Sequence, residues 1–296
     1  MVSLSRSGDR TLEEKEALLG YALIAPSLLL IAAVILYPVL YNIYLSFTVV
    51  PLSPAESPEW IGLQHYQDLL GSGEFWSALW TTVVFTFFST TLATLGGLGA
   101  ALLFNRKFRG QRFARGLVLL PYVAPLISIA FVWRFMLDPL YGIVPYVGAD
   151  VLGLYGGDVD LLSNERTALW SVIFVDAWRY FPFAFLMLIA RVQAIPSDMY
   201  EAAKIDGASR FAQFKDITLA ELKYILATVF LLRWIWNFNK FADIWLLTRQ
   251  VETLPVYAYT VAFANYQHGQ AAAISMVLFL ALIGFVLVYV AWILDW

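Results

Sequence analysis

The chain has 296 residues, of which 60% are hydrophobic and 14% are charged, and its formal net charge is −3. A soluble domain carries about 25% charged residues, so this composition indicates a chain whose main solvent is the lipid bilayer. The small net negative charge argues against a nucleic-acid-binding protein, which would carry an excess of basic residues. The lack of cysteine excludes disulfides and thiolate metal sites.

The first 17 residues are predicted to form a cytoplasmic segment, and residues 18–296 to form one transmembrane domain. Basic and acidic side chains are mixed in the segment, and the apolar run after it is too long for a cleaved signal peptide. We therefore expect this run to remain in the protein as a membrane helix.

Six apolar stretches are long enough to cross a hydrocarbon core of about 30 Å, which takes roughly 20 helical residues. Backbone groups in lipid must be paired within the segment, so each stretch is predicted to be a helix, and the expected fold is an all-α membrane protein. The predicted crossings are Leu18–Phe47, Trp76–Phe104, Leu117–Leu137, Ala168–Ala190, Lys223–Leu247 and Ala271–Leu294. The Pro/Gly-rich loops 48–75, 138–167 and 248–270 are predicted to be short turns with one small helix.

Small residues recur at four-residue spacing in the second predicted crossing, at Ala93, Gly97 and Ala101. This spacing lets two helices approach closely. Packing within the chain explains the pattern, and a contact with another subunit is the alternative.

The distribution of Lys and Arg predicts the orientation, because cytoplasmic loops carry an excess of both. Of the 19 basic residues, 13 lie in the N-terminal segment and in the loops 105–116 and 191–223. The alternate loops carry only Arg166 and Arg249. Both termini are therefore predicted to be cytoplasmic.

The loop 195–222 contains more structure than a connection needs. Pro196 and Ser197 are typical of a helix start, and Asp198 in the first turn suits the helix dipole. Gly207 offers a break, because glycine takes left-handed angles at little cost, and a second short helix is predicted at Ser209–Lys215. On physical grounds alone, an amphipathic connector on the membrane surface remains an alternative.

The sequence Glu201-Ala202-Ala203, followed by Gly207 and Ile217-Thr218-Leu219, resembles the EAA loop of ABC importer permeases. The resemblance implies the type I importer permease fold and a loop that docks in a cleft of the ATPase subunit. One departure is Ala220, where the family usually has proline. The residues that it implies for ATPase coupling are Glu201, Ala202, Ala203, Asp206, Gly207 and Ala208.

Charged residues also lie inside the predicted crossings, where each costs roughly 2.5–3.5 kcal/mol at a helix centre, so they must face protein or a wet cavity. Two polar and aromatic stripes follow from helical spacing in the fourth and fifth crossings. Such stripes suit a sugar, because rings stack on its apolar faces and polar groups bond its hydroxyls. The residues concerned are Asp176, Tyr180, Phe183, Arg233, Trp236, Asn237 and Lys240. The alternative is internal pairing of Asp176 with Arg179, or of Lys240 with Asp243.

The first and last crossings also resemble carbohydrate-uptake permeases of the maltose type, at Ala25-Pro26-Ser27-Leu28 with Tyr37-Pro38, and at Ala271–Ser275. The resemblance places the sugar-contacting positions of that family on the seven residues of the two stripes, of which only Asn237 keeps its residue type. A di- or oligosaccharide is the implied cargo, and an anionic sugar or glycerol phosphate is the alternative.

The sequence has no G-x-x-x-x-G-K-[ST] motif, so the chain is not expected to bind or hydrolyse ATP, and it is not predicted to be an enzyme. His65 and His268 stand alone and predict no metal site. An ion-coupled secondary transporter is a less favoured alternative, because no inverted repeat is visible.

The resemblance implies a heteromeric complex in the cell membrane. Its expected partners are a second homologous permease, two ATPase subunits that carry ATP and Mg²⁺, and an extracytoplasmic solute-binding protein that delivers the carbohydrate.

Overall fold

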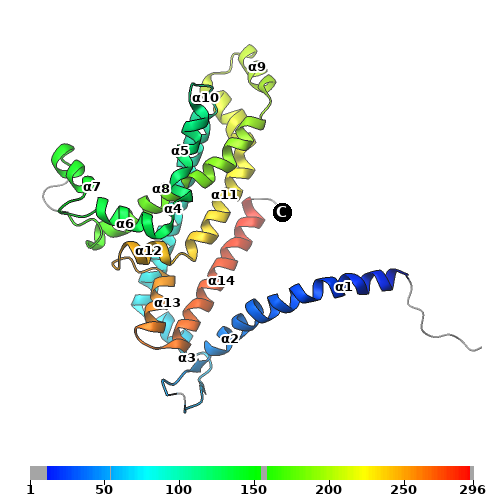
Figure 1. Ribbon diagram of the computed structural model, residues 1–296, viewed down its shortest axis with the longest axis vertical. Helices are drawn as coiled ribbons and strands as arrows, with labels where there is room; N and C mark the ends of the chain where they lie inside the picture. Colours follow the sequence, from blue (N-terminus) through cyan, green and yellow to red (C-terminus); the bar gives the residue numbers. More distant parts are fainter. Residues whose placement is uncertain (1–11, 54, 155–158, 294–296) are drawn as a thin grey trace, which may run out of the picture.

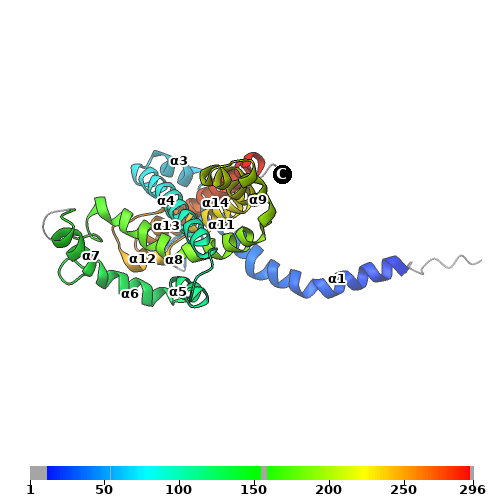
Figure 2. The same cartoon turned by 90° about the horizontal axis from the view of Figure 1, so that it is seen from above.

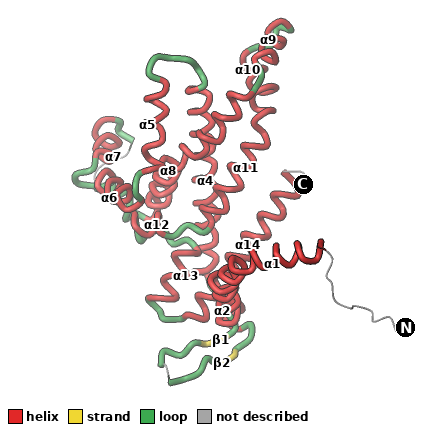
Figure 3. Tube along the Cα trace, turned by 45° about the vertical axis from the view of Figure 1, so that its right-hand side comes forward, coloured by secondary structure: helices red, strands yellow, loops and turns green. Residues whose placement is uncertain are grey.

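The computed structural model describes residues 12–53, 55–154 and 159–293, so residues 1–11 of the predicted cytoplasmic segment lie outside it. The long helices α4 (Gly73–Phe104), α8 (Glu165–Ala194), α11 (Ala220–Phe238) and α14 (His268–Ile293) form the body of the molecule (Figure 1). The short helices α9 (Ser197–Ile205) and α10 (Arg210–Gln213) lie at one end of this bundle. The loop between α4 and α5 lies at the same end (Figure 3), so the two basic inner loops come together as predicted.

In the part of the chain that the structure describes, four helical spans are long and apolar enough to cross a membrane, and they match four of the predicted crossings. They are Glu16–Leu45, Gly73–Phe104, Thr167–Ala194 and His268–Ile293. The first consists of α1 (Leu12–Ile31), a π-helical turn η1 (Ala32–Leu36) and α2 (Tyr37–Leu45). The total of six crossings and the side on which the termini lie stay predictions.

The expectation of one continuous third crossing is wrong. The chain forms α5 (Gln111–Val123) and α6 (Leu126–Met136), which meet at an angle of 94°. Ala124 is extended at ψ 142° because the proline that follows it disfavours helical angles, and Pro125 itself has ψ 137°. Beyond α6, α7 (Ile143–Tyr146) and the π-helical turn η2 (Val147–Val151) extend away from the bundle.

The fifth predicted crossing is also not a single helix. A π-helical stretch η3 (Phe214–Leu219) leads into α11, which ends at Phe238, and α12 (Ala242–Leu247) follows after a break. The side chain of Asn239, at this break, donates a hydrogen bond to the carbonyl of Ile235. A further helix, α13 (Leu254–Phe263), occupies the next loop. Its first turn is held by Thr82 Oγ1, which accepts a hydrogen bond from the backbone N–H of Leu254 at 2.7 Å.

The end of the bundle opposite α9 is closed by a small outer loop. Strands β1 (Thr48–Val49) and β2 (Glu59–Trp60) pair in antiparallel fashion, and the one small helix predicted for these loops is α3 (Gln64–Gly71) (Figure 3). The start of α14 packs against this loop so closely that a β-carbon at Gly269 would lie 2.0 Å from the carbonyl oxygen of Thr48.

The stripe of small residues on α4 packs within the chain, as predicted. Ala93, Gly97 and Ala101 are buried, and α4 makes its most extensive contact with α8. A β-carbon at Gly97 would lie 2.4 Å from the β-carbon of Ala184 and 2.6 Å from the backbone nitrogen of Phe185. Only glycine therefore allows the two helices to approach this closely.

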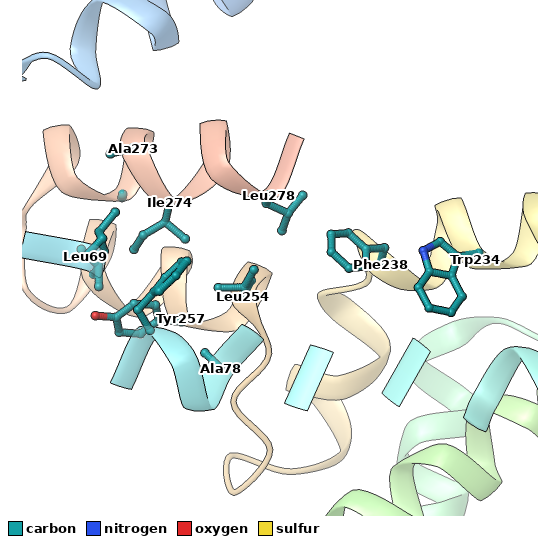
Figure 4. Close-up of a cluster of buried hydrophobic side chains, with 12 residues drawn as sticks. Leu69, Ala78, Trp234, Phe238, Leu254, Tyr257, Ala273, Ile274 and Leu278 are labelled. Carbon is teal, nitrogen blue, oxygen red and sulfur yellow. The ribbon is translucent and has the colours of Figure 1, made fainter. Parts of the chain in front are cut away.

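Apolar side chains form three clusters along the bundle. One lies toward the β1–β2 end, where α3, α4, α13 and α14 meet the end of α11 (Figure 4). The second joins α6, α8 and α12, and the third joins α4, α8 and α11 toward the α9 end. The polar side chains described below lie on the helices that these clusters hold together.

Helix α1 extends away from the bundle of long helices (Figures 1 and 2). The most apolar part of the span Glu16–Leu45 has none of its residues buried. Its large apolar side chains are therefore free to meet lipid or another chain.

We predict that Gly97→Val destabilises the protein by about 1–3 kcal/mol, because the new methyl groups overpack the contact between α4 and α8. Gly99→Val is the matched control, since nothing lies within 4 Å of a β-carbon there. Thermal unfolding of both variants in lipid nanodiscs measures the difference. Equal unfolding midpoints for the two variants would contradict the packing described.

Candidate functional site

The centre of the candidate site is the buried carboxylate of Asp176 on α8. It accepts hydrogen bonds from two cations, Arg233 of α11 at 2.8 Å and Lys240 at the α11–α12 break at 2.5 Å. Both cations and the carboxylate are almost fully buried. Burial strengthens the attraction between these charges because little water screens them. One carboxylate thus ties α8 to α11 and to the break that follows it.

A second, partly buried ion pair lies next to the first. Arg179 of α8 donates to Asp243 of α12 at 2.9 Å, and the hydroxyl of Tyr180 donates to the same carboxylate at 3.1 Å. The ring of Tyr180 also faces the cations, with Lys240 Nζ 3.7 Å and Arg233 Cζ 4.3 Å from its centroid. These distances are those of cation–π contacts, so Tyr180 links the two ion pairs.

Asn237 extends the network to α4. Its side-chain oxygen accepts from Arg233 at 3.0 Å, and its nitrogen donates to Thr90 Oγ1 at 3.1 Å. The network, called the charge cluster below, therefore spans α4, α8, α11 and α12. It consists of Thr90, Asp176, Arg179, Tyr180, Arg233, Asn237, Lys240 and Asp243.

The structure corrects the two internal pairings considered from the sequence. Asp176 pairs with Arg233 and Lys240 across helices, and not with Arg179 three residues along its own helix. Asp243 pairs with Arg179, and not with Lys240. The reason is geometric. Side chains on facing helices can form direct charge-assisted hydrogen bonds, and one carboxylate has two oxygens that can accept from two different cations.

The remaining predicted residues form an aromatic strip beside the charge cluster. The rings of Phe183 and Trp236 meet edge to face at a centroid distance of 5.0 Å, and Tyr122 of α5 bridges to Tyr180 at 6.1 Å and to Phe183 at 6.3 Å. Trp236 is 45% exposed and Tyr122 37% exposed, so the strip is open to the surroundings of this chain. All seven residues predicted for the substrate site thus lie in one continuous region, whose role in binding stays a prediction.

The predicted coupling residues form a separate element at the end of the bundle. Helix α9 ends at Ile205, Gly207 has φ +81°, and Ser209 caps α10 by accepting from the backbone N–H of Ala212. The predicted helix, glycine break and second helix are therefore confirmed. Most of the six residues predicted for coupling are exposed, and the apolar side chains of Ile205 and Phe211 are 87% and 73% exposed.

Sequence reasoning missed the contributions of Thr90 and Tyr122. A signal for Thr90 was present, because Thr82, Thr86, Thr90 and Thr94 recur every four residues and thus share one face of α4. All four are buried. Tyr122 carried no comparable signal, because its approach depends on the bend between α5 and α6.

Comparison with known proteins identifies a family that the sequence matches. Residues 93–295 match the family described as binding-protein-dependent transport system inner membrane component. The chain is 42% identical to the inner membrane ABC transporter permease protein YcjO of Escherichia coli over 265 residues, which cover 90% of each chain. It is 35% identical to the trehalose/maltose transport system permease protein MalF of Thermococcus litoralis over 286 residues, or 94% of each chain.

Solved structures share the fold. A chain of a bacterial ABC transporter involved in the import of the acidic polysaccharide alginate superposes with a TM-score of 0.76 at 20% identity, covering 94% of this chain and 95% of that one. A chain of a bacterial alginate transporter in complex with a pentasaccharide-bound periplasmic protein gives a TM-score of 0.77 at 18% identity, covering 95% of this chain and 96% of that one.

We predict that Asp176→Asn lowers stability by about 3–5 kcal/mol, because it leaves two buried cations without their shared counter-charge. Arg191→Gln is the control. The side chains of Arg191 and Glu221, which form an ion pair, are 46% and 31% exposed, so this pair is expected to contribute about 0–1 kcal/mol to stability. The thermal unfolding of each variant in lipid nanodiscs is compared with that of the unmodified protein. A loss no larger for Asp176→Asn than for Arg191→Gln would refute the central role of this carboxylate.

Proposed function

Because this chain belongs to the family of binding-protein-dependent transport system inner membrane components, we propose that it carries a di- or oligosaccharide across the cytoplasmic membrane along the aromatic strip and the charge cluster. The chain is a multi-pass permease subunit of an ABC importer, and its homologues include sugar-transport permeases. The proposal concerns the type of cargo, the residues that contact it and the route by which ATP drives it.

One observation carries the proposal that the cargo is a saccharide. The aromatic strip, which is partly exposed, lies next to buried hydrogen-bonding groups of the charge cluster. Rings stack on the apolar faces of a sugar, and the adjoining donors and acceptors bond its hydroxyls. Relatives support this reading by their names, which include a trehalose/maltose permease, a trehalose permease and a sulfoquinovosyl glycerol permease.

The coupling proposal is supported by the shape and exposure of the α9–Gly207–α10 element. It lies at one end of the bundle (Figure 1). Two of its large apolar side chains, Ile205 and Phe211, are exposed, and small alanines adjoin them in the sequence. Exposed apolar groups on a rigid projection are typical of an interaction surface. In this proposal the element docks in a partner ATPase subunit, which binds ATP and Mg²⁺.

The exposure of α1 supports the proposal of a second permease subunit. An apolar helix that its own bundle leaves uncovered gains burial by packing against a homologous chain. The aromatic strip is likewise open on the side of Tyr122 and Trp236, so a partner chain would complete the walls of the pathway. The ligand would arrive from an extracytoplasmic binding protein at the end opposite α9.

In the proposed cycle, ATP binding draws the α9–α10 elements of the two permeases together, and hydrolysis releases them. Helices α8 and α11 flank this element in sequence and carry the predicted substrate residues. A rigid movement at the coupling end thus exposes the strip alternately to the two sides of the membrane. A secondary transporter would need neither the ATPase nor the projection.

We predict that Trp236→Ala raises the KM for saccharide uptake up to about tenfold, because loss of one stacking ring removes about 0.5–1.5 kcal/mol beyond its buried area. Trp292→Ala is the control, since Trp292 is also an exposed tryptophan but lies at the end of α14, outside the aromatic strip. Uptake is measured in proteoliposomes that contain the complete importer with its binding protein. An unchanged KM in Trp236→Ala would remove the strip from the pathway.

We predict that Ile205→Glu reduces recovery of the ATPase subunit with the permease roughly tenfold or more, as expected for loss of a central interface anchor. Leu140→Glu changes a similarly exposed leucine far from α9 and is expected to leave recovery unchanged. Co-purification followed by uptake measures both variants. Full recovery with Ile205→Glu would place the ATPase contact elsewhere, and transport by the purified chain without ATP would overturn the proposed function.

A further inference from the structure

The charge cluster contains more positive than negative charge. Three cations, Arg179, Arg233 and Lys240, face two carboxylates, Asp176 and Asp243, which leaves a surplus of one positive charge. In the described part of the chain, the ion pairs of these three cations involve these two carboxylates alone. A surplus charge that is removed from water is costly unless a counter-ion joins it.

Arg233 also retains free hydrogen-bond donors. Its Nη2 atom donates to both Asp176 and Asn237, whereas Nε and Nη1 have no hydrogen-bond partner among the described residues although the side chain is wholly buried. A guanidinium group has five N–H donors, and a buried donor without a partner costs about 1–3 kcal/mol. The residue is therefore equipped to bind a further acceptor.

The surplus charge lies where the proposed pathway would bring a ligand. Lys240 and Arg233 contact the Tyr180 ring, and Tyr122 and Phe183 continue the strip from Tyr180 toward the exposed Trp236. A saccharide stacked on the strip places its substituents within reach of these cations once Tyr180 moves aside. Both carboxylates are already engaged by cations, so they offer little to an uncharged sugar.

From this imbalance we propose that the cargo is a saccharide that carries one negatively charged group, such as a carboxylate, sulfonate or phosphate. The anionic group joins Lys240 and Arg233 and balances the cluster during passage. Charge-assisted hydrogen bonds are about twice as strong as neutral ones, so this contact discriminates against the uncharged sugar. The inference rests on the proposed function, because it assumes that a saccharide passes along the strip.

The test measures uptake of matched neutral and anionic saccharides by the complete importer with its binding protein, in proteoliposomes that contain ATP. The pairs are maltose with maltobionate, cellobiose with cellobionate, and trehalose with trehalose 6-phosphate. The first two pairs supply a carboxylate and the third a phosphate, so the panel also separates these two sources of charge. Uptake of an anionic member at least tenfold faster than its neutral counterpart is the expected result.

The variant Lys240→Gln removes the surplus charge and leaves the pairs Arg233–Asp176 and Arg179–Asp243 in place. It is expected to lower the ratio of anionic to neutral uptake at least tenfold, and Lys240→Arg is expected to preserve the ratio. Thermal unfolding verifies that both variants are folded, and Arg233→Gln provides a second neutralised cluster. Two outcomes overturn the inference and leave the proposed function intact: ATP-dependent uptake of neutral saccharides alone, or an unchanged ratio of anionic to neutral uptake in folded Lys240→Gln. Saccharide transport without ATP overturns the proposed function instead.

Discussion

The arrangement of this molecule depends on the need to neutralise a carboxylate buried within a membrane protein. Asp176 has almost no contact with solvent, so it must be bound by cations or fail to ionise. Because one of its partners lies on α11 and the other in the break between α11 and α12, the carboxylate holds the break as well as the contact between helices. The interruption of the fifth predicted crossing is thus compensated by charge and not by apolar packing alone.

Close approach of the helices makes this compensation possible. Gly97 lets α4 lie against α8 near Ala184, and Thr90, two turns earlier on α4, meets the side chain of Asn237. Asn237 in turn orients Arg233 toward Asp176. A larger side chain at position 97 would separate α4 from α8, and Asn237 would lose its partner on α4. Apolar packing and the polar network therefore support each other.

Much of this arrangement could be predicted from the sequence, and the predictions that were wrong failed for identifiable physical reasons. Helical spacing placed Asp176 and Tyr180 on one face of a helix, and Arg233 and Asn237 on one face of another, because periodicity is a local property. The choice of a charged partner on another helix depends on tertiary packing, which is not local. The sequence therefore offered Arg179 as the partner of Asp176, whereas the structure pairs Asp176 with Arg233 and Lys240. Hydropathy likewise records that a segment is apolar and does not record its direction, which is why the bend before Pro125 was missed.

The coupling element and the charge cluster lie on the same two helices, and this connection has a mechanical consequence. The chain passes from α8 through α9 and α10 into α11, so the projection is the turn of a helical hairpin. At 1.5 Å per residue, Arg233 lies roughly 20 Å along α11 from its start, and Asp176 about 27 Å along α8 from its end. The ion pair between these residues joins the two arms of the hairpin at a distance from its turn. A displacement of α9 and α10 consequently reaches the cluster as movement of a joined pair of helices, and a ligand that competes for Arg233 or Lys240 would loosen the same joint. In the proposed function, cargo and motor would therefore act on one set of contacts, although each has its own binding surface.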